Sequence, residues 1–340
     1  MELTLSGEQK QLVESFAALY ARESSVDRVR AAEPLGFDPK LWQALCDTGV
    51  LEMAVGEQYG GWGSSVLELA LIADQFGRAV ASAPVIEAQV AVRLLSSVGA
   101  AAADLLASAL SGDKLVVFAP RTYPDRALQL VPGGAVADVV VAHAAGKLLA
   151  VPVAGSGRRQ VENLGTLPLA DLPVGEDAVV LADGAGAERL HAGAVDVWLT
   201  LTAAALAGAA ARAVDIGAQY AKQRTAFGTP IGAFQAVSHP LADSATASDG
   251  ARLLALEAAC SFADEPTRTT ELAAMAFAFA YETARDATRR SLHVHGGYGF
   301  GMEGDIQLYY RRARAWALVF GDSEAALDRV SDARYGVAAS

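Results

Sequence analysis

The sequence predicts an α+β protein whose helical and β segments occupy separate parts of the chain. Apolar residues make up 52% of its 340 residues and charged residues 19%, which argues against disorder and allows two or three domains. Ala and Leu outnumber β-branched residues over most of the length, which favours helix. Short β-rich runs are confined to the stretch from Lys114 to Leu190. This order of helices, strands and helices indicates segregated domains.

The first part of the chain carries start signals for several helices. Ser6 is a candidate N-cap for a helix over residues 8–20, and Asp38 followed by Pro39 opens a second helix. Residues 55–63 are rich in turn formers and form a linker. Residues 66–76 follow as a long apolar helix.

The middle of the chain contains four runs with β character, separated by Gly, Pro, Asn and Asp. The runs cover residues 115–119, 136–142, 148–153 and 178–181. Helical patterning resumes at Asp196 and continues nearly to Arg334, with a break at residues 264–266. We therefore expect three domains, at residues 1–112, 113–190 and 191–340.

Composition excludes several classes of function. The net charge of −12 argues against a nucleic-acid partner, because phosphate binding needs a basic face. The longest uncharged run, residues 197–211, is too short for a membrane span and is expected to be a buried helix. The N-terminus has no secretory signal pattern, so we expect a cytoplasmic protein. Cys46 and Cys260 lack the spacing of a zinc site, and no metal is expected.

Two turns between long apolar helical patterns have the chemistry of an anion site. Residues 220–235 place Arg224, a Phe-Gly step and Pro230 at the end of one helical pattern and the start of the next. Residues 293–300 form a second turn that is dense in glycine. Free backbone N–H groups and a guanidinium are what an anionic ligand requires. A glycine turn that only ends a helix is the simpler alternative for each.

Three segments resemble the acyl-CoA dehydrogenase family, in the order in which that family has them. Gly56-Glu-Gln-Tyr-Gly-Gly resembles its Pro-Glu-x-x-Gly-Gly linker. Gln223-Arg-x-x-Phe-Gly-x-Pro-Ile-x-x-Phe-Gln235 is similar to its most specific motif. His295-Gly-Gly-Tyr-Gly299, with Tyr310-Arg311 downstream, is similar to a third.

The resemblance implies an N-terminal helical domain, a small β-domain and a C-terminal four-helix bundle, with FAD lying across a subunit interface. In that family the second and third motifs contact the pyrophosphate and adenosine of the neighbouring subunit's FAD. The corresponding residues here are Arg224, Phe227, Gln235, His293, Gly296, Gly297 and Gly299. His293 stands where the family usually has Gln, and His295 is expected to be structural. Glycines let the backbone approach a diphosphate, and Arg224 supplies a forked cation.

The residues that would supply a catalytic base depart from the family. Its members remove an α-proton of the acyl-CoA with a glutamate, and alignment places Phe320 at the usual position and Trp198 at the less common one. Neither side chain is basic. Asp196 and Asp322 lie nearby as substitutes, although Asp196 is more simply a helix N-cap and Asp322 a turn residue.

The β-domain also lacks the two stretches with which family members hold the flavin ring. The chain therefore resembles the short, degenerate subunit of actinobacterial heteromeric acyl-CoA dehydrogenases, which pairs with a homologous catalytic subunit and often handles CoA esters of steroid side chains. The implied partners are that subunit, an acyl-CoA and an electron-transfer acceptor. Two alternatives stay open: a self-sufficient homomeric dehydrogenase with a displaced Asp base, and a non-catalytic assembly scaffold.

Overall fold

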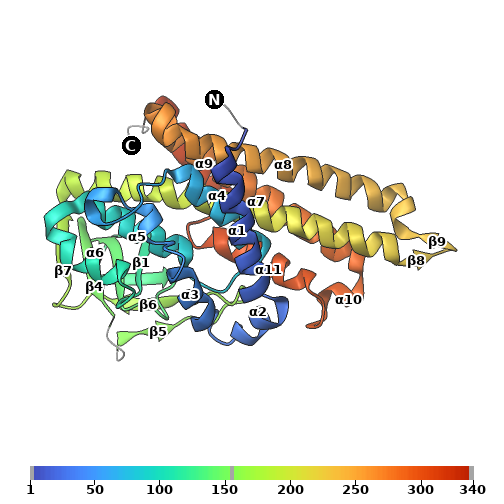
Figure 1. Cartoon of the computed structure of the whole chain (residues 1–340), viewed down its shortest axis with the longest axis horizontal. Helices are drawn as coiled ribbons and strands as arrows, with labels where there is room; N and C mark the ends of the chain where they lie inside the picture. Colours follow the sequence, from blue (N-terminus) through green and yellow to red (C-terminus); the bar gives the residue numbers. More distant parts are fainter. Residues whose placement is uncertain (1–3, 154–156, 337–340) are drawn as a thin grey trace. The chain divides into compact units, whose positions relative to one another are not determined.

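The computed structural model describes residues 4–153 and 157–336. Helices come first, strands occupy the middle and long helices follow, as the ribbon shows (Figure 1). The predicted α+β class is confirmed. The chain divides into two compact units, one of Met1–Val26, Ala70–Ala81 and Leu199–Ser340, the other of Asp27–Leu69 and Ser82–Trp198. The division into domains at residues 112 and 190 stays a prediction.

The N-terminal helices begin where the sequence places their caps. The Ser6 hydroxyl accepts a hydrogen bond from the Gln9 amide, and the Gln9 side chain accepts one from the Ser6 amide, which forms a capping box. Asp38 accepts from the amides of Lys40 and Leu41 in the same way. The α-helices of this part are α1 (Gly7–Glu23), α2 (Val26–Ala32), α3 (Pro39–Cys46), α4 (Val66–Arg78), α5 (Val85–Val98) and α6 (Ala103–Leu110).

The strands of the middle part, as far as the structure describes it, form two small sheets. The larger has the order β1-β3-β4-β7 and comprises β1 (Val116–Tyr123), β3 (Val139–Ala144), β4 (Lys147–Pro152) and β7 (Val179–Asp183). β1 and β3 are parallel, whereas β4 is antiparallel to both of its neighbours. These are the four predicted strands. The sequence missed β2 (Ala127–Val131), β5 (Arg159–Gln160) and β6 (Ala170–Pro173), which form the second sheet, because they are short.

The longest helix, α7 (Gly184–Gln223), begins earlier than predicted. β7 ends at Asp183 and the helix starts at the next residue, so the expected start at Asp196 is wrong. The sequence shows only a weak helical pattern before Asp196, because the first turns of α7 are rich in glycine and mostly half-buried or exposed. From Val197 through Ala210 every residue is buried, as expected for a core helix.

Within the part of the chain that the structure describes, two stretches are long and apolar enough to cross a membrane by length and composition, Val85–Leu110 and Gly184–Gln223. In α7, 94% of the apolar window is buried inside the chain. The other stretch is broken at Gly99, whose φ of +79° interrupts the helical backbone between α5 and α6. α7 is therefore a core helix, and Val85–Leu110 is two shorter ones.

The helices after α7 complete the second helical part. α8 (Gln235–Asp264), α9 (Thr269–His295), α10 (Gly297–Phe300), α11 (Ile306–Leu318) and α12 (Ser323–Tyr335) follow in order. Arg312, which is 2% exposed, donates from α11 to the carbonyl oxygens of Val80 and Ala81 after α4. Its charge is thereby partly compensated by carbonyl oxygens of the segment that follows α4.

Helices α4 and α7 approach each other at two glycines. A Cβ built on Gly77 would lie 1.8 Å from the carbonyl oxygen of Ala205, and one on Gly208 would lie 2.1 Å from that of Asp74. Neither carbonyl belongs to a flexible side chain that could move aside. The two backbones therefore touch at positions where no other residue type fits.

Replacing Gly208 should consequently destabilise the chain, although alanine is the better helix former. We expect Gly208→Ala to lower the free energy of unfolding by about 1 to 3 kcal/mol, the usual cost of overpacking a core. Gly193→Ala is the matched control in the same helix, because its Cβ meets nothing within 4 Å. That control should be neutral or stabilising by up to about 1 kcal/mol. Urea denaturation followed by circular dichroism measures both, and equal midpoints would contradict the close approach.

Candidate functional site

The first predicted turn is a β-hairpin at the end of α7. β8 (Thr225–Ala226) pairs with β9 (Thr229–Pro230), and the two residues between them have φ values of +53° (Phe227) and +81° (Gly228). Two positive φ angles in a two-residue loop are typical of a type I′ turn. Figure 1 shows the hairpin at the end of the bundle where α7 ends and α8 begins.

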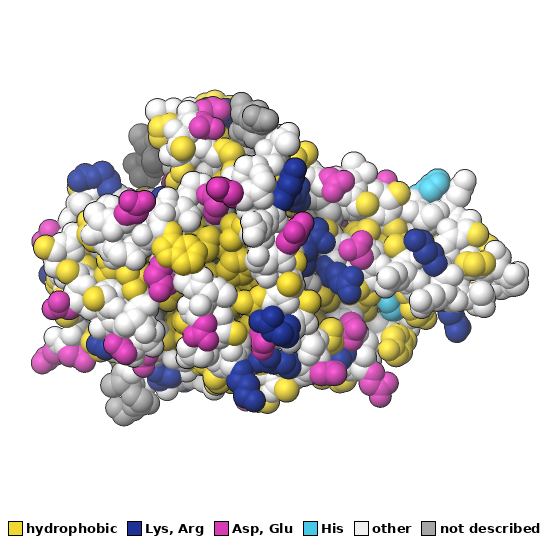
Figure 2. Space-filling view, in the orientation of Figure 1, with side chains coloured by type: hydrophobic (Ala, Val, Ile, Leu, Met, Phe, Trp, Pro, Cys, Tyr) yellow, Lys and Arg dark blue, Asp and Glu magenta, His cyan; other side chains and the backbone are white. Residues whose placement is uncertain are grey.

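Phe227 is both strained and exposed. A non-glycine residue with a left-handed backbone costs about 1 to 3 kcal/mol, and the side chain at this position is 97% exposed. Its ring meets that of Phe234 edge-on, with 6.2 Å between ring centroids. Figure 2 shows hydrophobic side chains at the surface near this end of the bundle. The strained backbone and the exposed ring together make Phe227 a candidate contact residue.

The two polar residues predicted for this turn lie on either side of the hairpin. Arg224 is exposed directly after α7, and its guanidinium forms no ion pair with any residue that the structure describes. Its carbonyl oxygen accepts from the Ile231 amide at 2.8 Å, which closes the base of the turn. Gln235 is the exposed first residue of α8. The hairpin thus presents a solvated cation and an amide beside Phe227.

The glycines of the turn at the end of α9 differ in their structural roles. Gly296 has a φ of +60°, which ends the helix after His295. Gly297 is exposed, and a Cβ there would meet nothing within 4 Å, so its backbone is open to a ligand. Gly299 is buried, and its Cβ would lie 2.8 Å from the Leu292 carbonyl oxygen, so its role is packing. His293 is exposed on the last turn of α9.

A stacked ring pair joins the helices that carry the two turns. Tyr220, one turn before Arg224, stacks on His295 with 4.2 Å between ring centroids. The His295 Nδ1 lies 2.7 Å from the Ser291 carbonyl oxygen, and the Ser291 hydroxyl donates to the Ala213 carbonyl oxygen at 2.6 Å. His295 is buried and structural. The ends of α7 and α9, and with them the predicted FAD residues, therefore lie together at one end of the bundle.

A packed phenylalanine lies at the position where the sequence predicts the usual catalytic glutamate. Phe320 follows α11, and its ring meets Phe277 of α9 edge-on, with 5.8 Å between centroids. Phe277 is completely buried. Asp322, two residues later, is exposed and accepts hydrogen bonds from the amides of Glu324 and Ala325. It is the N-cap of α12, which is a more definite role than the turn residue predicted.

The second base position holds an indole bound to a carboxylate. Trp198 is 1% exposed in α7, and its Nε1 donates to Oε1 of Glu87 in α5 at 3.2 Å. Burial raises the pKa of the half-buried Glu87 carboxyl. Asp196 is buried inside α7, so its predicted role as a helix N-cap is wrong because the helix begins twelve residues earlier. Glu87 was missed because nothing in the sequence pairs α5 with Trp198.

The part of the β-domain in which the sequence lacks the flavin-ring stretches, residues 118–124 and 133–138, is engaged in internal packing. Residues 118–123 lie within β1, and Gly133 packs so closely that a Cβ there would meet the Val117 side chain at 2.8 Å. The carbonyl oxygens of Ala135 and Ala137 accept from the Arg158 guanidinium. Much of the backbone around the 133–138 turn is therefore bound internally.

Two family models match the chain. "Acyl-CoA dehydrogenase, N-terminal domain" matches residues 6–104, and "Acyl-CoA dehydrogenase, C-terminal domain" matches residues 199–334. Acyl-CoA dehydrogenase IpdE2 of Mycolicibacterium smegmatis is 31% identical over 340 residues, covering 96% of this chain and 98% of that protein. The chain belongs to the acyl-CoA dehydrogenase family. IpdE2 of Mycobacterium tuberculosis is 30% identical over 337 residues, with the same coverage of 96% and 98%.

Solved structures agree with this family. The chain superposes on the Tcur3481-Tcur3483 steroid ACAD with a TM-score of 0.88 at 26% identity, over 97% of this chain and 98% of that one. It superposes on a chain of the ChsE4-ChsE5 complex from Mycobacterium tuberculosis with a TM-score of 0.88 at 23% identity, over 100% of both. The predicted acyl-CoA dehydrogenase fold, FAD as cofactor and FAD-dependent acyl-CoA oxidoreductase activity are confirmed at the level of the family.

The Glu87–Trp198 pair should make stability depend on pH. Because the pKa of Glu87 is raised on folding, the folded chain keeps a proton that the unfolded chain loses above about pH 4.3. Stability should therefore fall as the pH rises from that value to the raised pKa, and stay level above it. Glu87→Gln keeps an oxygen for the Trp198 N–H and removes the charge. We expect it to flatten this slope and raise the urea midpoint at pH 7.

The matched control is Glu188→Gln, because Glu188 is exposed in α7. This variant should leave the slope unchanged. Urea midpoints at several pH values between 4 and 8, measured by circular dichroism, compare the three proteins. A slope in Glu87→Gln identical to that of the unchanged chain would show that Glu87 is solvated rather than buried.

Proposed function

We propose that this chain is the non-catalytic partner in a heteromeric FAD-dependent acyl-CoA dehydrogenase. It contributes the half-site for the FAD pyrophosphate and adenosine to a homologous catalytic subunit. The observation that carries the proposal is the contrast between the two halves of the site. Arg224 and Phe227 are presented to solvent, whereas the base positions hold the packed rings of Phe320 and Trp198.

The residues of the bundle end fit the part of FAD assigned to them. A diphosphate needs a cation and accessible backbone N–H groups, which Arg224 and Gly297 offer. The exposed Phe227 ring presents an apolar face to the adenosine, and Gln235 and His293 add polar groups at the rim. FAD, when bound, accepts the hydride from the acyl chain. The residues of this chain bind and orient it.

The proton step belongs to the partner in this proposal. Removing the α-proton of a thioester requires a positioned carboxylate, and the two positions at which the family carries it hold the aromatic residues Phe320 and Trp198 here. Asp322 is engaged in capping α12, and Asp196 is buried within α7. A homomeric enzyme that uses one of these two as base is the second reading, and a scaffold without cofactor is the third.

The relatives support both the assembly and the substrate class. One neighbour is described as a steroid ACAD and another as a complex of two different subunits, ChsE4 and ChsE5. We therefore assign as substrate the CoA thioester of an acyl group such as a steroid side chain, with an electron-transfer acceptor reoxidising the flavin. We also propose a cytoplasmic location, because these reactants are soluble in water.

Flavin content distinguishes the three readings. The chain purified alone should carry little FAD and should not reduce a ferricenium dye with acyl-CoA. Copurified with its catalytic partner, it should form a complex with bound flavin, visible by absorbance and by analytical ultracentrifugation. A yellow, active chain alone would favour the homomeric enzyme. Absence of FAD from both samples would favour the scaffold.

Arg224 should affect cofactor retention rather than chemistry. Arg224→Ala removes a charge-assisted contact of roughly 1.5 to 3 kcal/mol, so the complex should bind FAD about tenfold to hundredfold more weakly. Turnover per bound flavin should change little, because the guanidinium would hold the pyrophosphate and not the reacting ring. Arg189→Ala is the control, an exposed arginine elsewhere in α7. Equal FAD affinity in the two variants, measured by flavin fluorescence titration, would remove Arg224 from the site.

A further inference from the structure

A cavity of about 310 Å³ lies between α6 and the larger sheet. Its size is at the lower end of the range for small-molecule sites, roughly 300 to 1,000 Å³. The whole cavity lies within the unit that contains the strands. Nothing in the proposed dehydrogenase function uses it.

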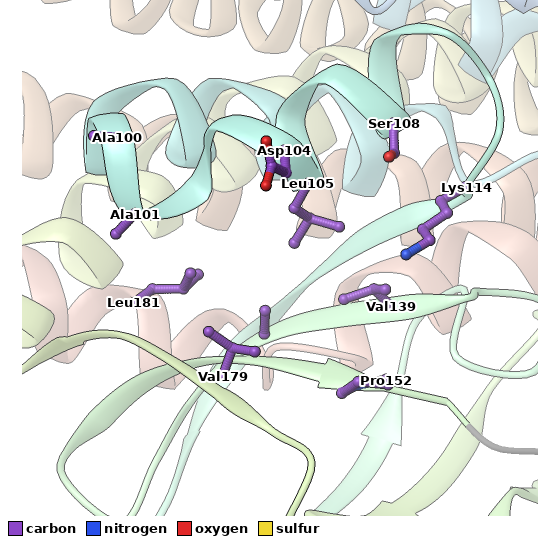
Figure 3. A pocket seen from close by; sticks show the side chains of 11 residues that line it. Ala100, Ala101, Asp104, Leu105, Ser108, Lys114, Val139, Pro152, Val179 and Leu181 are labelled. Carbon is purple, nitrogen blue, oxygen red and sulfur yellow. The ribbon is translucent and has the colours of Figure 1, made fainter.

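The floor of the cavity is an apolar face at the edge of the sheet. Val139 of β3 is paired with Pro152 of β4, and Ala150 of β4 is paired with Val179 of β7, so all four side chains line the same side. β7 is an edge strand of this sheet, and Val179 is 53% exposed. Leu105 of α6 covers the floor from above (Figure 3). An apolar ligand would bury surface that the chain leaves wet.

A single cation points into this apolar space. Lys114 immediately precedes β1, and its ammonium group is directed into the cavity (Figure 3). Within residues 4–153 and 157–336 it has no ion pair. The Ser108 hydroxyl lies on the same side, whereas the carboxylate of Asp104 lies one helical turn earlier. The two ends of the cavity therefore differ in charge. One end has a positive charge and a hydroxyl, and the negative charge lies nearer the other end.

We propose that this cavity binds an apolar monocarboxylate. The carboxylate would lie against Lys114 and Ser108, and the hydrocarbon would cover Val139, Val179 and Leu105. An ammonium at the edge of an apolar surface gains from a carboxylate because both are partly removed from water. Asp104 repels a carboxylate in the reverse orientation, and Lys114 repels a cationic head group at its own end of the cavity.

Decanoate is the probe, with decanol and decyltrimethylammonium as neutral and cationic analogues. Isothermal titration calorimetry on the full chain should show saturable decanoate binding with a Kd below about 1 mM. Lys114→Met keeps the length of the side chain and removes its charge. It should weaken decanoate about tenfold and leave decanol unchanged. Lys147→Met, an exposed lysine at the start of β4, is the control and should bind decanoate like the unchanged chain.

A second variant tests the position independently of charge. Ala101 is exposed at the rim of the cavity, so Ala101→Trp should fill the space without disturbing the core and should abolish binding of both decanoate and decanol. Circular dichroism confirms that each variant is folded. No saturable binding to the unchanged chain would overturn the proposal. So would equal decanoate affinity in Lys114→Met and Lys147→Met, or unchanged binding in Ala101→Trp.

Discussion

The close approach of α4 and α7 is the constraint on which the helical unit depends. Gly77 and Gly208 let two backbones touch where a single methyl group would collide with a carbonyl oxygen. The neighbouring residues of α7 are mostly small, and every residue from Leu199 through Ala210 is buried. A helix packed in this way cannot shift along its axis. The residues at its C-terminal end are therefore presented from a rigid base.

That rigid base explains how a short hairpin can present an unfavourable side chain. The Tyr220–His295 stack and the Ser291 hydrogen bond tie α7 to α9 just before both turns begin. Phe227 is held in a left-handed backbone with its ring in solvent, a state that only a well-supported turn maintains. The same end carries the open backbone of Gly297. This end of the bundle therefore combines a strained backbone with an exposed side chain, which is typical of binding surfaces.

The two predicted positions of the catalytic base are, in contrast, filled by packed side chains. The ring of Phe320 packs on Phe277, and Trp198 is buried with its N–H bound to Glu87. These contacts stabilise the fold and leave no free carboxylate at either position. This contrast between an exposed surface and filled base positions is what our proposal of a catalytic partner chain rests on. The cavity beside Lys114 is a separate feature, since it faces solvent at the edge of strand β7.

The sequence by itself determined the fold class, the family, four of the strands and the residues of the two turns. Local signals sufficed for these: caps at Ser6 and Asp38, β-rich runs, and motifs whose spacing is fixed within one segment. It misplaced the start of α7 and the role of Asp196, because a glycine-rich first turn carries no strong helical pattern. Only the tertiary structure decided that Phe227 is exposed, that Glu87 meets Trp198 and that Lys114 faces a cavity. Each of these depends on residues far apart in the chain, whose distances follow from packing and not from spacing.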